Sequence, residues 1–354
     1  MKYAFLTMLA LLLALSSCGR GDGDKGFYTK FNDLIDHSKP IAFGEDEDIY
    51  VFCGTQNWAR LETLIRSSVE REVALVYNEK YFFITPADIK EIDQLSKYKN
   101  LLFIGSLEAG DPVSNHIRQS LSPDLIDRVK TSGGDLFITK NRFTRDQLIL
   151  HLVAKDDGRL VDLANIQANK IFDTLLDRYR KRLAYHAYQI KVITEDFFQP
   201  YPFSLKIPEN YSLYSNDPKN NFLSFIYRAR LQNREIPDKY ISVHWVEMET
   251  DKVDEAWLLQ KRIEIGERHF DGDVLDPTKL RTEKFNFAGF EGFRLSGPWE
   301  NRKHMIGGAF QSYAFWHPQS RKAYFVDNSV YFPAGNKLPI LAELFMVSSS
   351  LKIK

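Results

Sequence analysis

The chain has 354 residues, and its 47 Lys and Arg residues balance its 47 Asp and Glu residues. This balance argues against a nucleic-acid-binding protein, in which basic residues are normally in excess. An apolar content of 44% with 27% charged residues predicts packed domains rather than a disordered chain. The length is sufficient for two domains of ordinary size.

The first 17 residues have the features of a secretion signal. Lys2 precedes an apolar run over residues 4–15, and the small residues Ser16 and Ser17 follow it. The run is shorter than the roughly 20 residues that a membrane-spanning helix needs, and this arrangement is typical of a signal peptide. The tetrapeptide that ends at Cys18 resembles the lipobox of bacterial lipoproteins. That resemblance implies that Cys18 is acylated and is the first residue of the mature protein.

Acylation of Cys18 predicts attachment to membrane lipid, because two or more acyl chains hold a protein stably at a bilayer. The Gly-rich stretch over residues 19–26 cannot bury apolar surface, and we interpret residues 18–44 as a lipid anchor and flexible tether. In enterobacterial lipoproteins an Asp directly after the lipidated Cys retains the protein in the inner membrane. Gly19 stands at that position here, so the resemblance implies the outer membrane. Whether the protein faces the periplasm or the cell surface is left open.

Residues 45–190 alternate strand-like and helix-like segments. Continuous apolar runs predict strands covered on both faces, and they lie at residues 49–53, 81–84, 101–105, 134–139 and 147–153. Apolar side chains at helical spacing predict helices over residues 56–72, 87–97, 113–119, 123–130 and 159–188. Such alternation predicts an α/β domain with a mostly parallel sheet.

Residues 200–354 follow a different pattern, which begins after prolines at positions 200, 202 and 208. Apolar and polar residues alternate, as in antiparallel strands covered on one face, and the expected strands are residues 222–231, 240–249, 285–295, 309–316 and 323–332. Helices are expected over residues 253–268 and 337–347. We therefore predict an antiparallel sheet with helices packed on one side, and an α+β chain overall.

Several short motifs in the second half carry a family resemblance. They are Gly-Pro-Trp-Glu at residues 297–300, the segments 305–310, 330–337 and 341–343, and Ile-Pro-Glu-Asn-Tyr at residues 207–211. Together with the start of the chain they resemble an uncharacterised family of Bacteroidetes lipoproteins, domain of unknown function 4837. The resemblance implies an envelope location and an architecture but no activity. The second half also looks like the small sheet-and-helix domains of the Mog1/PsbP type, although a fold does not determine a function.

The end of the first predicted strand is a candidate site, because ligands of open parallel sheets bind beyond the carboxyl ends of the strands. Cys53 ends that strand, and Thr55, Gln56 and Asn57 begin the following helix. A helix N-terminus can lower the pKa of a thiol. However, no resolving cysteine accompanies Cys53, and a buried cysteine usually behaves as a small apolar residue.

No motif in the sequence predicts a cofactor or a metal. The eight histidines form no His-x-x-x-His or His-Glu-x-x-His pair, and neither a Gly-x-Ser-x-Gly elbow nor a nucleotide-binding glycine motif occurs. Because Trp and Tyr are enriched at interfaces, the second half offers one candidate ligand or partner surface. It comprises Trp299, His304, Gly307, Gly308 and Tyr313, for which packing in the core is the alternative.

From these features we predict a membrane-tethered, non-catalytic binding or interaction protein of the cell envelope. Its expected partners are membrane lipid, through acylated Cys18, and an envelope protein or another envelope component, without nucleic acid. Two alternatives remain. One is an envelope enzyme with its site near Cys53, and the other is a carrier of a small ligand.

Overall fold

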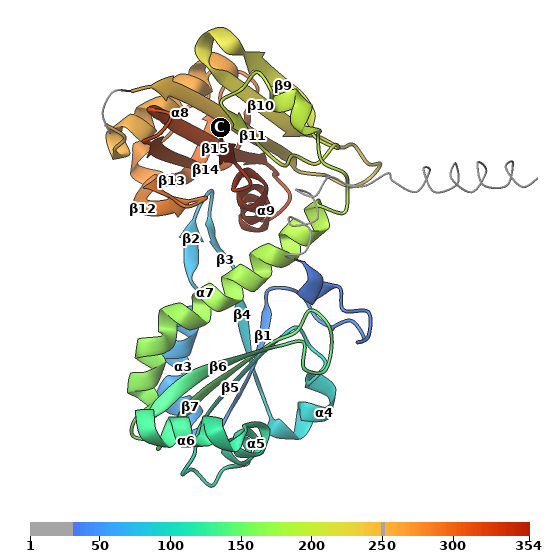
Figure 1. Ribbon diagram of the computed structural model, residues 1–354, viewed down its shortest axis with the longest axis vertical. Helices are drawn as coiled ribbons and strands as arrows, with labels where there is room; N and C mark the ends of the chain where they lie inside the picture. Colours follow the sequence, from blue (N-terminus) through green and yellow to red (C-terminus); the bar gives the residue numbers. More distant parts are fainter. Residues whose placement is uncertain (1–30, 249–251) are drawn as a thin grey trace, which may run out of the picture.

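The computed structural model describes residues 31–248 and 252–354. The predicted signal peptide, Cys18 and residues 19–30 lie outside the described residues. The described chain forms two parts, each built on its own sheet, and the long helix α7 (Leu160–Ala187) runs between them (Figure 1). No helix in these two ranges is long and apolar enough to cross a membrane.

The N-terminal part contains a five-stranded sheet that is mostly parallel, as predicted. Across the sheet the strands are β4 (Phe83–Ala87), β1 (Asp48–Cys53), β5 (Asn100–Ser106), β7 (Leu148–Ala154) and β6 (Gly134–Lys140). Only the last pair, β7 and β6, is antiparallel. Every residue of β5 and β7 is buried, as their continuous apolar runs predict for strands covered on both faces.

Helices cover both faces of this sheet. The helices of the N-terminal part besides α7 are α3 (Thr55–Val69), α4 (Ile92–Leu95), α5 (Pro112–Ser120) and α6 (Pro123–Ser132). α3 and α7 bury apolar side chains on one face, and α5 and α6 on the other. Where a helix was expected over residues 87–97, the structure has a 3-10 turn, η2 (Ile89–Glu91), and the single turn of α4.

The second part is built on a seven-stranded sheet in which every pair is antiparallel. In order, the strands are β12 (Arg281–Phe287), β13 (Phe290–Asn301), β14 (Ile306–His317), β15 (Lys322–Tyr331), β11 (Asp238–Glu247), β10 (Phe222–Tyr227) and β9 (Ser212–Asp217). Smaller elements complete the chain: η1 (Asn32–Leu34), η3 (Glu195–Phe198), η4 (Pro218–Asn220), η5 (Pro277–Lys279), and the strand pair β8 (Phe203–Ser204) and β16 (Lys352–Ile353). The predicted fold class is therefore confirmed.

One detail differs from the expectation of helices on one side. Helix α9 (Leu338–Ser348) packs on one face of the sheet, whereas α8 (Glu255–His269) packs on the other. The polar residues that alternate along the strands are buried beneath α8, where they form hydrogen bonds with one another. The hydroxyls of Ser224 and Ser242 lie 2.9 Å apart, and Ser312 donates to Asp327 at 2.5 Å. Alternation in sequence does not distinguish such buried polar pairs from solvent-exposed residues.

A hairpin that was not expected from the sequence connects the two parts. Strands β2 (Glu72–Ala74) and β3 (Asn78–Lys80) reach from the N-terminal part towards α9 (Figure 1). The carboxylate of Glu79 accepts hydrogen bonds from the backbone amides of Lys337 and Leu338, at 3.0 and 2.7 Å. One continuous apolar core extends from β1 through α7 to α9. The two parts thus share a core as well as polar contacts.

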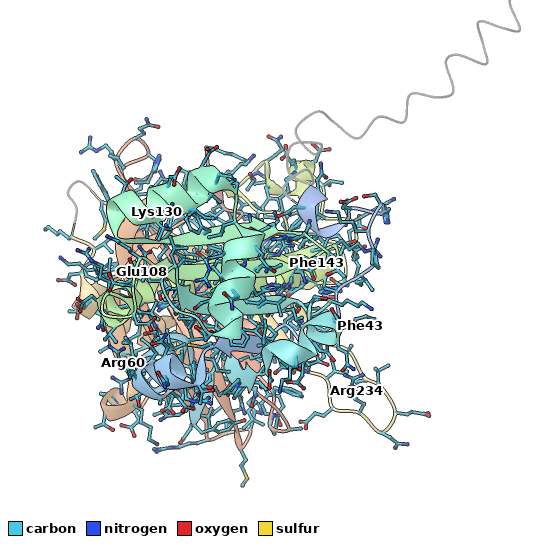
Figure 2. The ribbon with its side chains drawn as sticks, turned by 90° about the horizontal axis from the view of Figure 1, so that it is seen from below. Phe43, Arg60, Glu108, Lys130, Phe143 and Arg234 are labelled. Carbon is cyan, nitrogen blue, oxygen red and sulfur yellow. The ribbon has the colours of Figure 1, made fainter. Side chains whose placement is uncertain are left out.

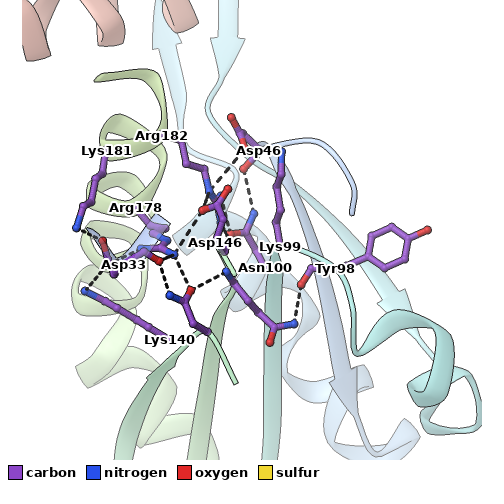
Figure 3. A network of polar contacts seen from close by, with 12 residues as sticks. Asp33, Asp46, Tyr98, Lys99, Asn100, Lys140, Asp146, Arg178, Lys181 and Arg182 are labelled. Carbon is purple, nitrogen blue, oxygen red and sulfur yellow. Dashed lines mark hydrogen bonds and ion pairs between the residues drawn. The ribbon is translucent and has the colours of Figure 1, made fainter. Parts of the chain in front are cut away.

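The amino ends of the parallel strands carry a buried polar network, shown in Figure 3. Arg182 of α7 binds the Asp146 carboxylate at 2.8 Å and donates to the Asn100 side chain at 2.9 Å. Arg178 of the same helix pairs with Asp33 at 2.7 Å. The side chains of both arginines are 2% exposed. Residues 31–44, which the sequence analysis assigned to the tether, are therefore part of the packed domain, with Phe31, Leu34 and Ala42 buried.

Candidate functional site

A cleft of about 790 Å³ lies beyond the carboxyl ends of β1, β4 and β5, at the edge of the sheet opposite the arginine network. Figure 2 shows the molecule from below, looking onto the end that contains the cleft, and labels Arg60 of α3 and Glu108 of the loop after β5. The lining residues come from the ends of strands and the starts of helices: Val51, Cys53, Gly54, Thr55, Gln56, Asn57, Trp58, Pro86, Ala87, Asp88, Ile89, Lys90, Ala109, Gly110, Asp111, Pro112, Val113 and Asp157. This position is where open parallel sheets bind their ligands.

All four residues of the N-terminal candidate site line this cleft. Cys53 is the last residue of β1, and α3 begins at Thr55, so Gln56 and Asn57 lie in its first turn. Asn57 is buried, and its side-chain amide donates to Asp157 at 2.9 Å. The structure therefore places Cys53, Thr55, Gln56 and Asn57 together.

Besides Asp88, whose side chain caps η2, two further carboxylates line the cleft that were not predicted from the sequence. One oxygen of Asp111 accepts from the amides of Val113 and Ser114, at 2.9 and 3.0 Å, and thereby caps α5. One oxygen of Asp157 accepts from Asn57 and from the Ser106 hydroxyl, the latter at 2.7 Å. In the part of the chain that the structure describes, neither carboxylate forms an ion pair with Lys, Arg or His. The Asp-Pro helix start at residues 111–112 was a local sign of the first of them.

Glycine is required where the two carboxyl-end loops meet. A Cβ atom at Gly54 would lie 2.8 Å from the Asp111 carboxyl carbon. The absence of a side chain at Gly54 thus allows Asp111 to lie directly against the start of α3.

The thiol of Cys53 is unsuited to act as a nucleophile. Burial, together with the nearby carboxylates of Asp111 and Asp157, which disfavour a thiolate, raises its pKa to about 12. Only the thiolate is reactive. The positive effect of the helix N-terminus is therefore outweighed, and the thiol is protonated near neutral pH.

We expect Cys53 to be alkylated slowly in the folded protein. A cysteine in an unfolded chain has a pKa of about 8.5, so at pH 8 the folded protein should react with iodoacetamide at least ~100-fold more slowly than the same protein in guanidinium chloride. The rate should rise about tenfold with each pH unit, in proportion to the thiolate fraction, and should level off only near pH 12. Peptide mass spectrometry locates the modification at Cys53. Equal rates in the folded and unfolded protein would contradict this assignment and favour the enzyme alternative.

The remaining lining side chains comprise hydrogen-bonding groups, apolar side chains and the two charged residues Asp88 and Lys90. Thr55 and Gln56 provide donors and acceptors at the start of α3, and the Trp58 ring adds a flat apolar face. No group of three or more His, Cys, Asp or Glu side chains placed to hold a metal occurs among the described residues. Three carboxylates and one ammonium line the cleft, so it favours an uncharged or cationic polar ligand.

The candidate surface in the second half is only partly brought together. Trp299 and His304 both line a small cavity of about 80 Å³ beside the residues that follow α8, and His304 pairs with the exposed Asp271 at 2.9 Å. Gly307 and Gly308 lie opposite Glu300 and Trp299 in the strand pair β13–β14. A Cβ at Gly308 would lie 1.9 Å from the Val330 carbonyl oxygen. The absence of a side chain at Gly308 therefore allows β14 and β15 to approach closely.

Tyr313 does not join this group. It is completely buried and packs against Phe345 of α9, on the face of the sheet opposite Trp299. Because side chains alternate between faces along a strand, positions 308 and 313 of β14 belong to opposite faces of the sheet. The five residues therefore do not form one surface, and Tyr313 belongs to the core.

The similarities to known proteins each cover less than half of the chain. No curated protein matches the sequence significantly. The Ran-binding protein Mog1p of Saccharomyces cerevisiae matches 43% of this chain and 90% of its own, with 11% identity and a TM-score of 0.31. LpqN of Mycobacterium tuberculosis, described as involved in cell envelope biogenesis, matches 43% of this chain and 83% of its own, with 9% identity and a TM-score of 0.27. At the level of sequence, residues 191–349 match the family model of the domain of unknown function DUF4837.

Proposed function

We propose that the protein is a lipid-anchored, non-catalytic binding protein of the cell envelope, whose cleft at the carboxyl ends of the parallel strands takes a small polar ligand. The observation that carries the proposal is the cleft itself. Its volume of about 790 Å³ falls within the roughly 300–1,000 Å³ that is usual for small-molecule sites. Its cysteine is protonated, which argues against covalent catalysis by Cys53.

The chemistry of the cleft favours a ligand that donates hydrogen bonds. Each carboxylate uses one oxygen in the hydrogen bonds within the protein described above, which leaves Oδ2 of Asp111 and Oδ2 of Asp157 to accept bonds from a ligand. Hydroxyl or ammonium groups are suitable donors. A sugar-like or amine-bearing component of the envelope has this chemistry, and the Trp58 ring offers a face for its apolar side.

The packed segment around Asp33 lies at the end of the parallel strands that is remote from the cleft. Asp33 is held by Arg178 and Lys181 at the amino ends of the parallel strands, whereas the cleft lies at their carboxyl ends. An anchor that precedes Phe31 would therefore leave the cleft turned away from the attachment point. Such an arrangement suits a receptor that samples the aqueous space of the envelope.

One capture experiment tests both parts of this proposal. Tagged wild-type protein, the Cys18→Ala variant and an Asp111→Asn/Asp157→Asn variant are isolated from native envelope, and the bound small molecules are identified by mass spectrometry. Wild type should be in the membrane fraction with an acylated N-terminal Cys18, and Cys18→Ala should lose the acyl group. The double Asn variant should stay in the membrane but retain at least ~10-fold less ligand. Each Asn side chain has an uncharged NH2 group in place of one charged, accepting carboxylate oxygen.

Asn is also a good helix N-cap, so Asp111→Asn should leave α5 intact. Asp276→Asn provides a matched control, because Asp276 caps a short 3-10 helix outside the cleft. Equal ligand retention by the wild type and the double variant would contradict the cleft as the site. A mature N-terminus other than Cys18 would contradict the anchor.

A further inference from the structure

A second cavity, of about 190 Å³, lies where the end of α7 meets the C-terminal sheet. Its residues come from both parts of the molecule: His186, Ala187, Ile190, Pro208, Asn210, Tyr211, Tyr227, Lys239 and Glu343. Three of them belong to the Ile-Pro-Glu-Asn-Tyr segment that leads into the second half. The cavity is separate from the cleft described above and shares no lining residue with it.

The phenol of Tyr211 lacks a hydrogen-bond partner in the described structure, although the residue is only 5% exposed. A turn that Tyr211 closes by donating its amide to the Pro208 carbonyl directs the residue inwards. Its ring packs 5.7 Å from that of Tyr227, and the charge of Glu343 contributes to raising the pKa of the phenol, after burial itself. Buried hydroxyls are nearly always paired, because an unpaired one costs about 1–3 kcal/mol. The phenol is therefore an unused hydrogen-bond donor beside the cavity that Tyr211 lines.

Beside the phenol, the cavity wall carries one positive and one negative charge. The Lys239 ammonium lies 2.7 Å from both carboxylate oxygens of Glu343, and the two side chains are 14% and 20% exposed. The ammonium also lies 5.1 Å from the centre of the Tyr227 ring. Exposed Ile190 and the Pro208 ring add apolar surface to the cavity.

We propose that this cavity binds a small zwitterion of about the size of an amino acid. The carboxylate of the ligand would accept hydrogen bonds from Tyr211 and Lys239, and its ammonium group would lie at Glu343. The volume of about 190 Å³ equals that of roughly six water molecules at ~30 Å³ each. This space matches an amino acid with a short side chain and is too small for a nucleotide or an oligosaccharide.

Isothermal titration calorimetry on the purified full chain tests the proposal with glycine, L-alanine and D-alanine as probes. Acetate and methylammonium serve as ligands that carry only one of the two charges. We expect at least one amino acid to bind ~10-fold more tightly than either single-charge ligand. Tyr211→Phe should weaken that binding ~10-fold, and Glu343→Gln should remove the preference for the amino acid over acetate.

Stability measurements separate this role from a structural one. Tyr211→Phe removes a hydroxyl that has no partner, so the unliganded variant should be at least as stable as wild type in urea. Tyr214→Phe, a half-exposed tyrosine outside the cavity, is the matched control and should leave binding unchanged. Absence of binding by all three amino acids at millimolar concentration, or equal binding by wild type and both cavity variants, would overturn the proposal and indicate a water-filled cavity.

Discussion

Replacing Arg182 by Ala should lower the free energy of unfolding by about 3–5 kcal/mol, which is typical when one partner of a buried charge pair is removed. The Arg182 guanidinium donates to the side chain and the carbonyl of Asp146, both at 2.8 Å, and to Asn100 at 2.9 Å. Its loss would leave the half-buried Asp146 carboxylate with only Arg178, at 3.4 Å, and the buried Asn100 side-chain oxygen without its donor, and would also create a cavity beside α7. Urea denaturation followed by circular dichroism measures the effect.

Two further variants define the origin of this effect. Arg182→Lys keeps the charge but not the planar fork of donors, so we expect an intermediate loss. Arg268→Ala removes an exposed arginine that bonds Asn220 at 2.7 Å, and should change the stability by less than ~0.5 kcal/mol. If Arg182→Ala cost no more than Arg268→Ala, the network would be a surface feature without a structural role.

Replacing Glu79 by Ala should lower the free energy of unfolding by about 2–4 kcal/mol. Hydrogen bonds to charged groups contribute about 1.5–3 kcal/mol each, and their loss leaves buried amides unpaired. The first residues of α9 have no side-chain cap of their own, and the carboxylate of Glu79 binds the amides of Lys337 and Leu338 in its place. Glu79 lies in the N-terminal part, whereas α9 lies within the residues that match the DUF4837 family model. The C-terminal domain therefore depends on the first half of the chain for this cap.

The expected signature of Glu79→Ala is a loss of cooperativity. Wild type should unfold in one transition, since the two parts share a core, and the variant should show α9 and the C-terminal sheet unfolding at lower urea concentration. Hydrogen exchange of the α9 amides reports this directly. Glu72→Ala is the matched control, because Glu72 is an exposed carboxylate of the same hairpin that bonds Asn78. Unchanged exchange in α9 after Glu79→Ala would contradict the capping role.

The sequence by itself determined the classes of the two sheets and the position of the first candidate site. Continuous apolar runs such as those of β5 and β7 occur only where both faces of a strand are covered. The carboxyl end of a parallel strand is a ligand position in any open sheet, so Cys53, Thr55, Gln56 and Asn57 could be placed in a cleft from local order alone. These are short-range properties of the chain.

Only the tertiary structure decided which distant groups meet. Asp157 joins Asn57, which is 100 residues away, and Glu79 caps a helix more than 250 residues further along the chain. Alternation along the strands did not reveal that Tyr313 and Trp299 lie on opposite faces, or that Ser224 is buried beneath α8. The physical reason is that hydrogen bonds and burial depend on distance in space, whereas periodicity reports only the direction of a side chain relative to its own neighbours.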